Sequence, residues 1–245
     1  MNSETTSLVE AKSAREEWTA YLAFLKRPAL PARAAGFGQS SLAATLRLLA
    51  LDLSVMGTLI LFAIIAISGG FVPPSNALAE LDWNMLTIIG VVVLAPVLEE
   101  LFFRSWLSGR PGALISLPLA IAGIAAFQAL NGQSKLLAAG ILIGAVLAAV
   151  IAAVLLRKKP AYRWFGALFP ALFWLSTAAF ALVHLLNYTE GSLAMLLPLV
   201  IPQFISGSIF GFARVQYGLW SSIVLHMLHN GALVLVVVTA SKLGA

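Results

Sequence analysis

Long apolar runs separated by short polar stretches dominate the chain. A helix needs about 20 mostly apolar residues to cross a bilayer, and seven runs reach or approach that length. They predict an all-α polytopic membrane helix bundle, because a helix satisfies its own backbone hydrogen bonds in lipid. The predicted spans cover approximately residues 46–68, 85–107, 113–130, 136–156, 164–186, 193–218 and 219–241.

Composition agrees with a membrane protein. Of the 245 residues, 60% are hydrophobic and only 10% are charged, whereas a soluble domain carries about 25% charged residues. We therefore expect the lipid bilayer to cover most of the protein. The chain has no cysteine, which excludes disulfides, thiolate metal sites and cysteine catalysis.

The basic residues predict the orientation. With the N-terminus inside the cell (N-in), all but Lys135 and Lys242 of the 15 Lys and Arg residues lie on the cytoplasmic side, as positive-inside predicts. Glu80 and Asp82 then occupy an outer loop. Because the basic residues lie between apolar runs, the net charge of +5 does not indicate a nucleic-acid partner. A polytopic chain of this kind, with no organelle signal, fits a bacterial inner (cytoplasmic) membrane.

Residues 1–45 form the predicted cytoplasmic N-terminal segment. Trp18, Tyr21 and Phe24, followed by the basic residue Lys26, are typical of a short helix lying on the inner membrane surface. A loosely ordered tail is equally compatible with this segment. The transmembrane domain is predicted to cover 46–241.

Ionisable and strongly polar residues within the spans are candidates for function. Such a charge costs roughly 2.5 kcal/mol or more at the centre of a membrane helix, so it normally faces the bundle interior. The candidates are Asp52, Glu99, Glu100, Arg104, His184, Arg214, His226, His229 and Asn230.

Spacing organises these candidates. Glu100 and Arg104 are four residues apart with the acid first, which favours an ion pair on one helix. Glu99 lies about 100° around the helix from Glu100, so it remains available to face a cavity. His226 and Asn230 are also four residues apart and project from one helix face.

The other candidates have simpler interpretations. We interpret Asp52 and His229 as groups that hold helices together by hydrogen bonds. Arg214, beside Tyr217 at a turn between spans, is interpreted as a topology anchor.

Three short motifs resemble a known family. EELFFR (99–104), FALVH (180–184) and HMLHN (226–230) resemble the EExxxR, FxxxH and HxxxN motifs of the CAAX protease and bacteriocin-processing (CPBP, or "Abi") family, which is related to the type II CAAX prenyl endopeptidases. The motifs occur in the family's order on predicted spans. The resemblance covers roughly Leu81 to Leu235.

The resemblance implies an intramembrane endopeptidase of the glutamic type, acting on a membrane-associated peptide or protein. By analogy, Glu99 and His184 hold and activate a water molecule, with Glu99 as general base. His226 and Asn230 donate hydrogen bonds to the oxyanion of the tetrahedral intermediate.

Glu100 and Arg104, by the same analogy, brace the site or position the substrate. This sequence departs from the family in that residues 105–183 separate Arg104 from His184, which leaves room for an inserted helical pair at 113–156. Within it, Gly140 and Gly144 form a GxxxG packing face. By span counting, His184 also lies nearer the outer surface than Glu99.

Several alternatives remain open at this level. The substrate could be a prenylated or otherwise lipidated protein, or a bacteriocin-like peptide. No cofactor is expected, but Glu99, His184 and His226 would also suit a catalytic zinc ion, although the chain has no HExxH and an adjacent arginine disfavours a cation. A non-catalytic scaffold, transporter or immunity protein is the alternative from another class. A serine protease using Ser206 or Ser208 is a weaker one, since close packing explains small residues there.

Overall fold

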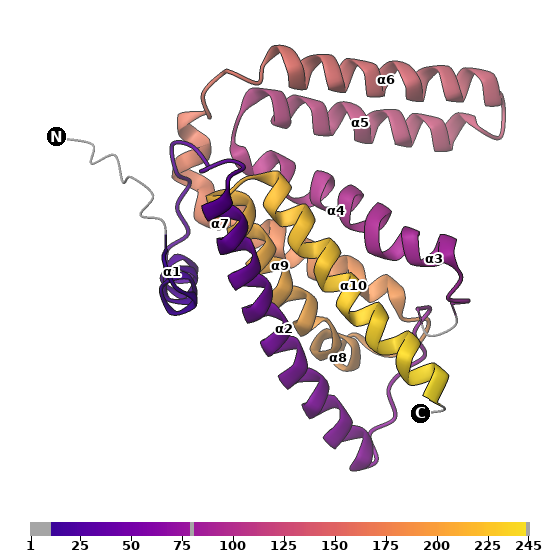
Figure 1. The fold of residues 1–245 in the computed structure, drawn as a ribbon. Coiled ribbons are helices and arrows are strands. Elements are labelled where there is room, and N and C mark those ends of the chain that lie inside the picture. Colours follow the sequence, from indigo (N-terminus) through magenta and orange to yellow (C-terminus); the bar gives the residue numbers. More distant parts are fainter. Residues whose placement is uncertain (1–10, 79–80, 244–245) are drawn as a thin grey trace. The chain divides into compact units, whose positions relative to one another are not determined.

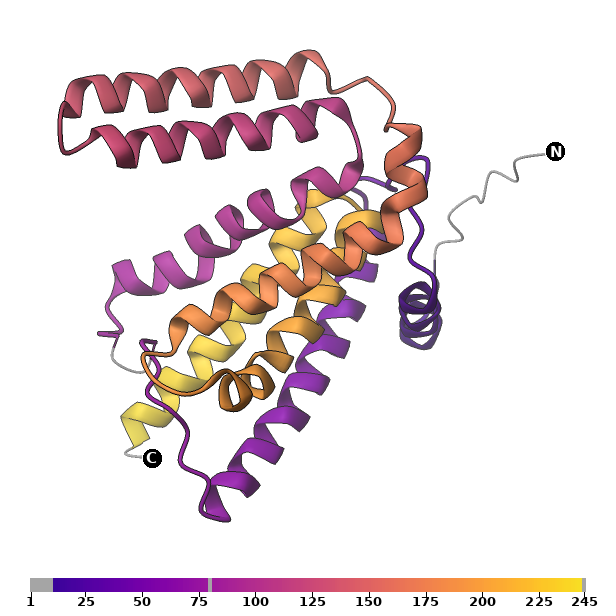
Figure 2. The ribbon, with the colours of Figure 1, turned by 180° about the vertical axis from the view of Figure 1, so that it is seen from behind.

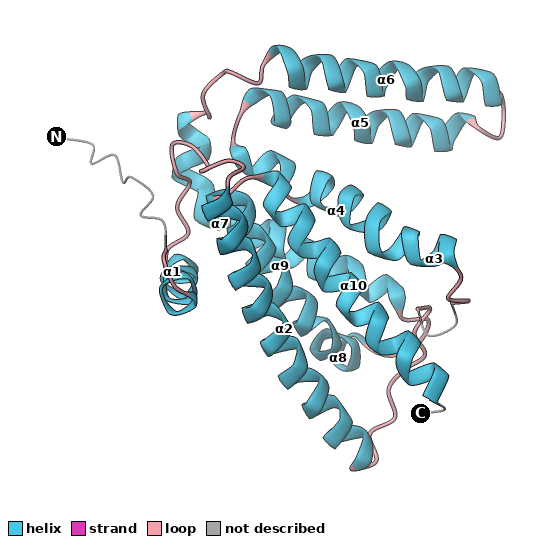
Figure 3. Ribbon diagram, viewed as in Figure 1, coloured by secondary structure: helices cyan, strands magenta, loops and turns pink. Residues whose placement is uncertain are grey.

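A computed structural model describes residues 11–78 and 81–243, with side chains described as far as Ala240. Residues 1–10 of the predicted N-terminal segment, Glu80 and the side chain of Lys242 lie outside this part. The chain forms two compact units, one of Met1–Arg104 with Pro170–Ala245 and one of Ser105–Phe169. Helices and loops make up the ribbon (Figures 1 and 3), confirming the all-α fold class for the described residues.

Seven helices of the described chain are long and apolar enough to cross a membrane, which confirms the predicted number of spans. The protein is therefore an integral membrane protein. The membrane-crossing stretches are Gln39–Ser68, Met85–Phe103, Pro111–Leu130, Lys135–Leu155, Arg163–Asn187, Leu193–Gln216 and Leu219–Ala240.

The first long helix, α2 (Gln39–Ser68), begins well before the predicted start at residue 46. Its early residues include buried polar groups, and the Thr45 hydroxyl lies 2.7 Å from that of Ser221 on α10 (Leu219–Leu243). Polar residues at Ser41 and Thr45 therefore belong to a packed helix face. The hydropathy pattern placed the start of this helix too late, because polar residues lower the mean hydropathy of its first turns.

The second predicted span, 85–107, contains three segments instead of one regular helix. They are α3 (Met85–Ile89), a π-helical stretch (Gly90–Leu94) and α4 (Ala95–Phe103). The predicted end of this span at residue 107 is wrong. The helix ends at Phe103, because side chains from other helices bond its last carbonyl groups. The Ser176 hydroxyl donates to Phe103 O at 2.6 Å, and Arg214 Nε donates to Arg104 O at 3.0 Å.

The predicted span 193–218 is also interrupted. It contains α8 (Leu193–Leu196), a 3₁₀ turn (Leu197–Val200) and α9 (Ile201–Gln216). Pro198 and Pro202 lie at these boundaries, where their missing N–H groups are tolerated. Gly218, with φ of 115°, then makes the turn into α10, a conformation that favours glycine.

The first unit is a bundle in which α10 packs against α2, α4 and α9, and α2 packs against α9. Figure 2 shows these helices from behind. Helix α7 (Arg163–Val183) contributes its part from Pro170 onwards to this unit. The packing brings α4 and α10, which carry the first and third motifs, into contact, and α10 also contacts α9.

Helix α1 (Ala14–Lys26) contacts α2 and α9. The Trp18 indole donates to Arg47 O at 2.9 Å, and the Tyr21 hydroxyl lies 2.6 Å from that of Ser208. The ring of Phe24 meets that of Phe173 at 5.0 Å. The alternative of a loosely ordered tail is therefore wrong for this stretch, which is a docked helix with one buried face.

The second unit is a helical hairpin of α5 (Pro111–Leu130) and α6 (Lys135–Leu155), followed by the start of α7. The two helices meet closely where Gly123 lies against Ala145. Gly140 and Gly144, predicted to form a packing face, do not lie at the contact between α5 and α6, because no atom of the described residues beyond their own stretch of helix lies within 4 Å of where their side chains would begin. Alanines of α6 form the contact face instead.

Candidate functional site

Glu100 and Arg104 form the predicted ion pair at the end of α4. Arg104 Nη1 donates to Glu100 Oε1 at 2.8 Å, and both side chains are fully buried. Two opposite charges one helical turn apart offset each other within a single span, which lowers the cost of placing either in lipid. The pairing is confirmed, and it leaves Glu99 outside the pair.

His226 brings α10 to both glutamates. Its Nδ1 lies 2.9 Å from Glu100 Oε1, and its Nε2 lies 3.7 Å from Glu99 Oε2. Since a carboxylate only accepts hydrogen bonds, Nδ1–H donates to Glu100 and Nε2 faces Glu99. The Glu99 side chain is 30% exposed, and its buried Oε2 receives no hydrogen bond from the described residues.

Aromatic rings surround the Arg104 guanidinium. Its carbon lies 3.8 Å from the ring centre of Phe180, and 5.7 and 5.9 Å from those of Phe103 and Phe210. Such rings attract a cation through their electron-rich faces, more strongly when water is excluded. Sequence reasoning did not identify Phe180 or Phe210 as site residues, although Phe180 is the first residue of the FALVH motif.

Phe210 also supports His226. The two rings stack at 4.6 Å with an interplanar angle of 27°, and Phe210 is fully buried. Phe180 meets the same imidazole edge-on at 5.6 Å. His226 is therefore held by the Glu100 carboxylate through Nδ1 and by two aromatic rings, one stacked on the imidazole and one packed edge-on.

His184 lies one helical turn beyond Phe180. Its Nδ1 is 2.7 Å from Phe180 O, and because a carbonyl accepts, Nδ1 carries the proton and Nε2 is left as an acceptor. Its ring meets that of Phe180 at 4.7 Å. The Phe180 ring thus contacts His184 as well as Arg104 and His226.

The packing also addresses the depth of His184. Spans two and five cross the membrane in opposite directions, and Arg104 lies over Phe180. The Ser176 hydroxyl bonds Phe103 O, so Glu99, four residues before Phe103, lies near the level of Phe180, four residues after Ser176. His184 lies one further turn, about 6 Å, beyond Phe180. The depth difference expected from span counting is therefore reduced to about one helical turn.

The recorded hydrogen bond of the Asn230 amide does not connect Asn230 to Glu99, Glu100, Arg104 or His226. Its Nδ2 donates to Val91 O at 2.8 Å, within the π-helical stretch that precedes α4. A π turn disturbs the regular pattern of helical hydrogen bonds, and Asn230 bonds one of its carbonyls. The amide nitrogen has a second N–H, so a role toward substrate stays a prediction.

Asp52 and His229 form a separate pair between α2 and α10. His229 Nδ1 donates to Asp52 Oδ2, and both residues are buried. This contact confirms that they link two helices. Arg214, interpreted as a topology anchor, bonds the carbonyl of Arg104 and so also contacts the end of α4.

The donor chemistry of Glu99, His184 and His226 would suit a zinc ion, since both imidazoles are held through Nδ1 and present Nε2. Among the described residues, however, no three His, Asp or Glu side chains are gathered closely enough to hold a metal. These three side chains are therefore not arranged around one common metal position.

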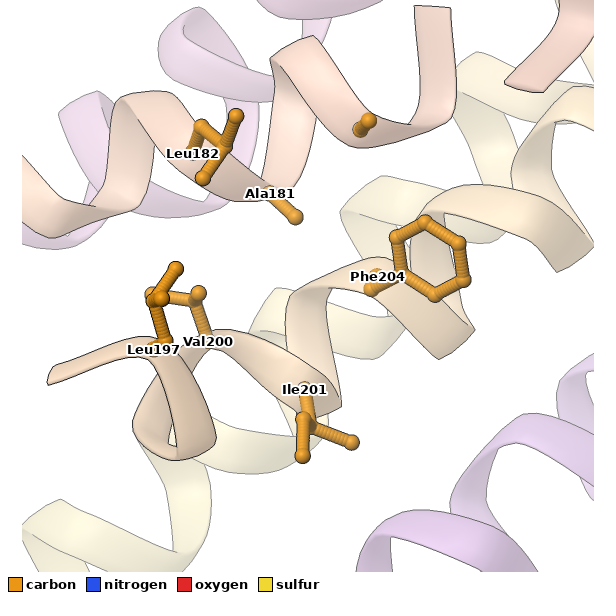
Figure 4. A pocket seen from close by; sticks show the side chains of 7 residues that line it. Ala181, Leu182, Leu197, Val200, Ile201 and Phe204 are labelled. Carbon is orange, nitrogen blue, oxygen red and sulfur yellow. The ribbon is translucent and has the colours of Figure 1, made fainter. Parts of the chain in front are cut away.

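One small cavity of the first unit lies away from this cluster. It has a volume of about 200 Å³, and Figure 4 shows apolar side chains of α7 facing those of the 3₁₀ turn and α9. It holds no ionisable group, so we do not assign chemistry to it. The lining residues are Ala178, Ala181, Leu182, Leu197, Val200, Ile201 and Phe204.

Comparison with known proteins gives one family match. The model of the family described as type II CAAX prenyl endopeptidase Rce1-like matches residues 81–232. This range is more than half of the chain and includes α4 with Glu99, Glu100 and Arg104, then His184, and α10 as far as Ala232. No curated protein and no solved structure matches the chain. On the family match, the chain belongs to the type II CAAX prenyl endopeptidase Rce1-like family.

Proposed function

We propose that the protein is an intramembrane endopeptidase that hydrolyses a peptide bond of a membrane-associated substrate with a water molecule activated by Glu99 and His184. The observation that carries the proposal is the position of Glu99. Its partly exposed carboxylate borders a buried network of Glu100, Arg104 and His226, and Oε2 accepts no hydrogen bond from the described residues.

Water activation follows from the two acceptors. Glu99 takes a proton from the water as general base, while His184 Nε2 accepts the other hydrogen and orients the oxygen. The resulting hydroxide attacks the carbonyl carbon of the scissile bond. Glu99 then gives its proton to the leaving nitrogen, the C–N bond breaks, and an acid and an amine are released.

Oxyanion stabilisation falls to His226, with the second N–H of Asn230 as a further donor. For His226 to donate from Nε2, it must carry a proton there in addition to the one on Nδ1. Glu99 Oε2 lies 3.7 Å from that nitrogen, so one proton can be exchanged between them. With the proton on His226, Glu99 is ionised and the base is ready.

Charge balance supports this arrangement. Glu99, Glu100 and Arg104 together carry one excess negative charge when ionised. One proton on either Glu99 or His226 neutralises the group of four, which is the arrangement that a low-dielectric membrane interior favours. The proposed active state is therefore a neutral cluster with its charges already separated for reaction.

For the substrate we propose a lipidated or other membrane-associated protein, in line with the family. Glu99 lies on a membrane-crossing helix, so the scissile bond has to reach the site from the bilayer or its surface. A bacterial inner membrane, with the N-terminus inside the cell, is the proposed location.

A zinc-dependent peptidase is the second candidate. It is favoured by one observation, the Nδ1 hydrogen bonds that leave Nε2 of both His184 and His226 facing outward from their partners. Incubation with a chelator distinguishes the two. Cleavage that survives 1,10-phenanthroline is expected for the glutamate mechanism, whereas loss that added zinc restores would require the metal.

The main test compares new peptide termini by mass spectrometry in membranes from cells that express the native protein or Glu99→Gln. Termini that depend on Glu99 are expected, and they would identify the substrates directly. His184→Ala should remove the same termini while the protein still inserts.

Glu16→Gln is the matched control, because Glu16 is an exposed glutamate of α1 whose bonds among the described residues are with the nearby Lys12 and Ser13. It should leave the termini unchanged. Identical profiles for native protein and Glu99→Gln at equal expression would reject the peptidase and favour a non-catalytic scaffold or immunity protein.

A further inference from the structure

Asp52 is a buried carboxylate that the proposed mechanism does not use. It lies within α2, a membrane-crossing helix, and its side chain is fully buried. It also lies outside residues 81–232, which the family model matches. An ionisable group in such a place is costly and usually has a function.

Helix cohesion alone explains this carboxylate poorly. Oδ2 accepts from His229 Nδ1, but Oδ1 receives no hydrogen bond from the described residues. A neutral amide would also accept from His229 at a lower cost of burial. What a carboxylate adds is a strong acceptor that fixes the tautomer and orientation of the imidazole.

His229 is placed to transmit that orientation to the site. It lies on α10 between His226 and Asn230, and its ring meets the face of Phe210 edge-on at 5.5 Å and 79°. The same Phe210 ring stacks on His226. One buried aromatic ring therefore contacts both imidazoles, whose own ring centres lie 6.4 Å apart.

Rotation of α10 would disturb several contacts together. His226 must reach Glu100, Asn230 must reach Val91 O, and His229 must reach Asp52. The first two contacts link α10 to the segment that carries Glu99. The third comes from α2 and restrains α10 from another direction.

We propose that Asp52 and His229 are positioning residues, which fix the rotation of α10 so that His226 and Asn230 meet the reacting groups. This inference rests on the proposed function. It assigns to α2 a part in catalysis that does not involve contact with substrate. Loss of the pair should lower kcat with little change in KM, because substrate binding does not use it.

The test replaces both partners by apolar residues, Asp52→Leu with His229→Leu. Removing both ends of a buried polar pair can be nearly neutral for stability. The substrate is a synthetic peptide spanning a Glu99-dependent cleavage site found by mass spectrometry. We expect native-like insertion and thermal stability but a kcat lowered at least about tenfold, since small misplacements of catalytic groups are costly.

The matched control removes another buried polar contact between the same two helices. Thr45→Val with Ser221→Ala deletes the hydroxyl pair at 2.7 Å. It should leave kcat within about twofold of native, a change of roughly 0.4 kcal/mol in barrier. An equal loss in both double variants would mean general packing and would overturn the proposal.

Two further outcomes are decisive. If Glu99-dependent cleavage exists and the apolar pair retains native kcat, the positioning role is wrong and the proposed function stands. If no cleavage depends on Glu99, both are wrong. Should the apolar pair fail to insert, Asp52→Asn, which keeps an acceptor, and Asp52→Ala are each compared with the native protein, and a native kcat in Asp52→Ala would overturn the proposal.

Discussion

At the scale of single residues, adjacent glutamates have different surroundings. Glu100 is fully buried between Arg104 and His226, while Glu99 is partly exposed and only borders His226. The helix rotation of about 100° between neighbours produces this division. It separates a group that stabilises the site from one that is available to react.

This division predicts that replacing Glu100 lowers stability strongly, whereas replacing Glu99 does not. Glu100→Leu leaves the Arg104 charge buried without its partner, which should cost about 3–5 kcal/mol of unfolding free energy. Glu99→Gln should leave the unfolding temperature in detergent unchanged, because no hydrogen bond to its Oε2 is lost. Thermal unfolding of both purified variants checks this.

A double variant completes the experiment. Glu100→Leu with Arg104→Met replaces the pair by apolar side chains and should recover much of the lost stability without recovering cleavage. If Glu100→Leu proved as stable as native protein, the ion pair would not be an important part of the buried network.

At the scale of elements, the glycines of α9 set how closely it approaches its neighbours. A side chain at Gly207 would begin 2.8 Å from Phe180 and 3.2 Å from Arg104 Nη2, whereas one at Gly211 would begin 2.8 Å from Phe173. Gly207 therefore faces the site, and Gly211 faces the packing near α1.

These contacts predict a contrast between two identical substitutions. Gly207→Ala should displace Phe180 and reduce cleavage strongly, while Gly211→Ala should mainly reduce stability by about 1–3 kcal/mol through overpacking. Gly57→Ala, where no described atom lies within 4 Å, is the control. Equal loss of cleavage in the first two, after correction for folded protein, would contradict this reading of α9.

Helix α1 carries a titratable contact outside the membrane-crossing segments. Glu17 is fully buried, and the Tyr217 hydroxyl donates to its Oε1 at 2.6 Å. Burial raises the pKa of Glu17 above its ordinary value of 4.5, although the bond from Tyr217 and the charge of Arg47 act to lower it. Docking of α1 is therefore linked to pH.

The sign follows from the raised pKa. The stabilisation is fully present below pH 4.5 and is lost as the pH rises from there through the raised pKa, since the docked state binds the proton more tightly. Tryptic cleavage after Lys26 should accelerate over that range relative to Glu17→Gln. Glu16→Gln should behave as native at each pH, and equal behaviour of native protein and Glu17→Gln would contradict the linkage.

Much of this architecture could be predicted from the sequence because it depends on short-range periodicity. Hydropathy found all seven spans, and the spacing of Glu100 and Arg104 predicted their ion pair. The partners of Asn230 and the docked face of α1 could not be predicted, because they depend on how helices rotate against each other. For the same reason, the spacing of Gly140 and Gly144 did not show that they lie outside the contact between α5 and α6.

At the scale of the whole molecule, orientation in the membrane stays a prediction that the chain makes easy to test. It has no cysteine, so one introduced cysteine is a unique reporter. With the N-terminus inside, Glu190→Cys should react with a membrane-impermeant maleimide on intact cells. Lys158→Cys should react only after permeabilisation, and the reverse pattern would require the opposite orientation.

The pairing of α10 with earlier helices also has a consequence for synthesis. Asp52 and Glu99 enter the membrane long before the ribosome reaches His229 and His226, whereas Glu100 meets Arg104 within four residues. The second span thus contains the positive charge that neutralises Glu100. Asp52 of the first span, however, has its His229 partner only after α10 has been made. Synthesis of α10 is therefore the event that gives the nascent bundle its remaining imidazole partners.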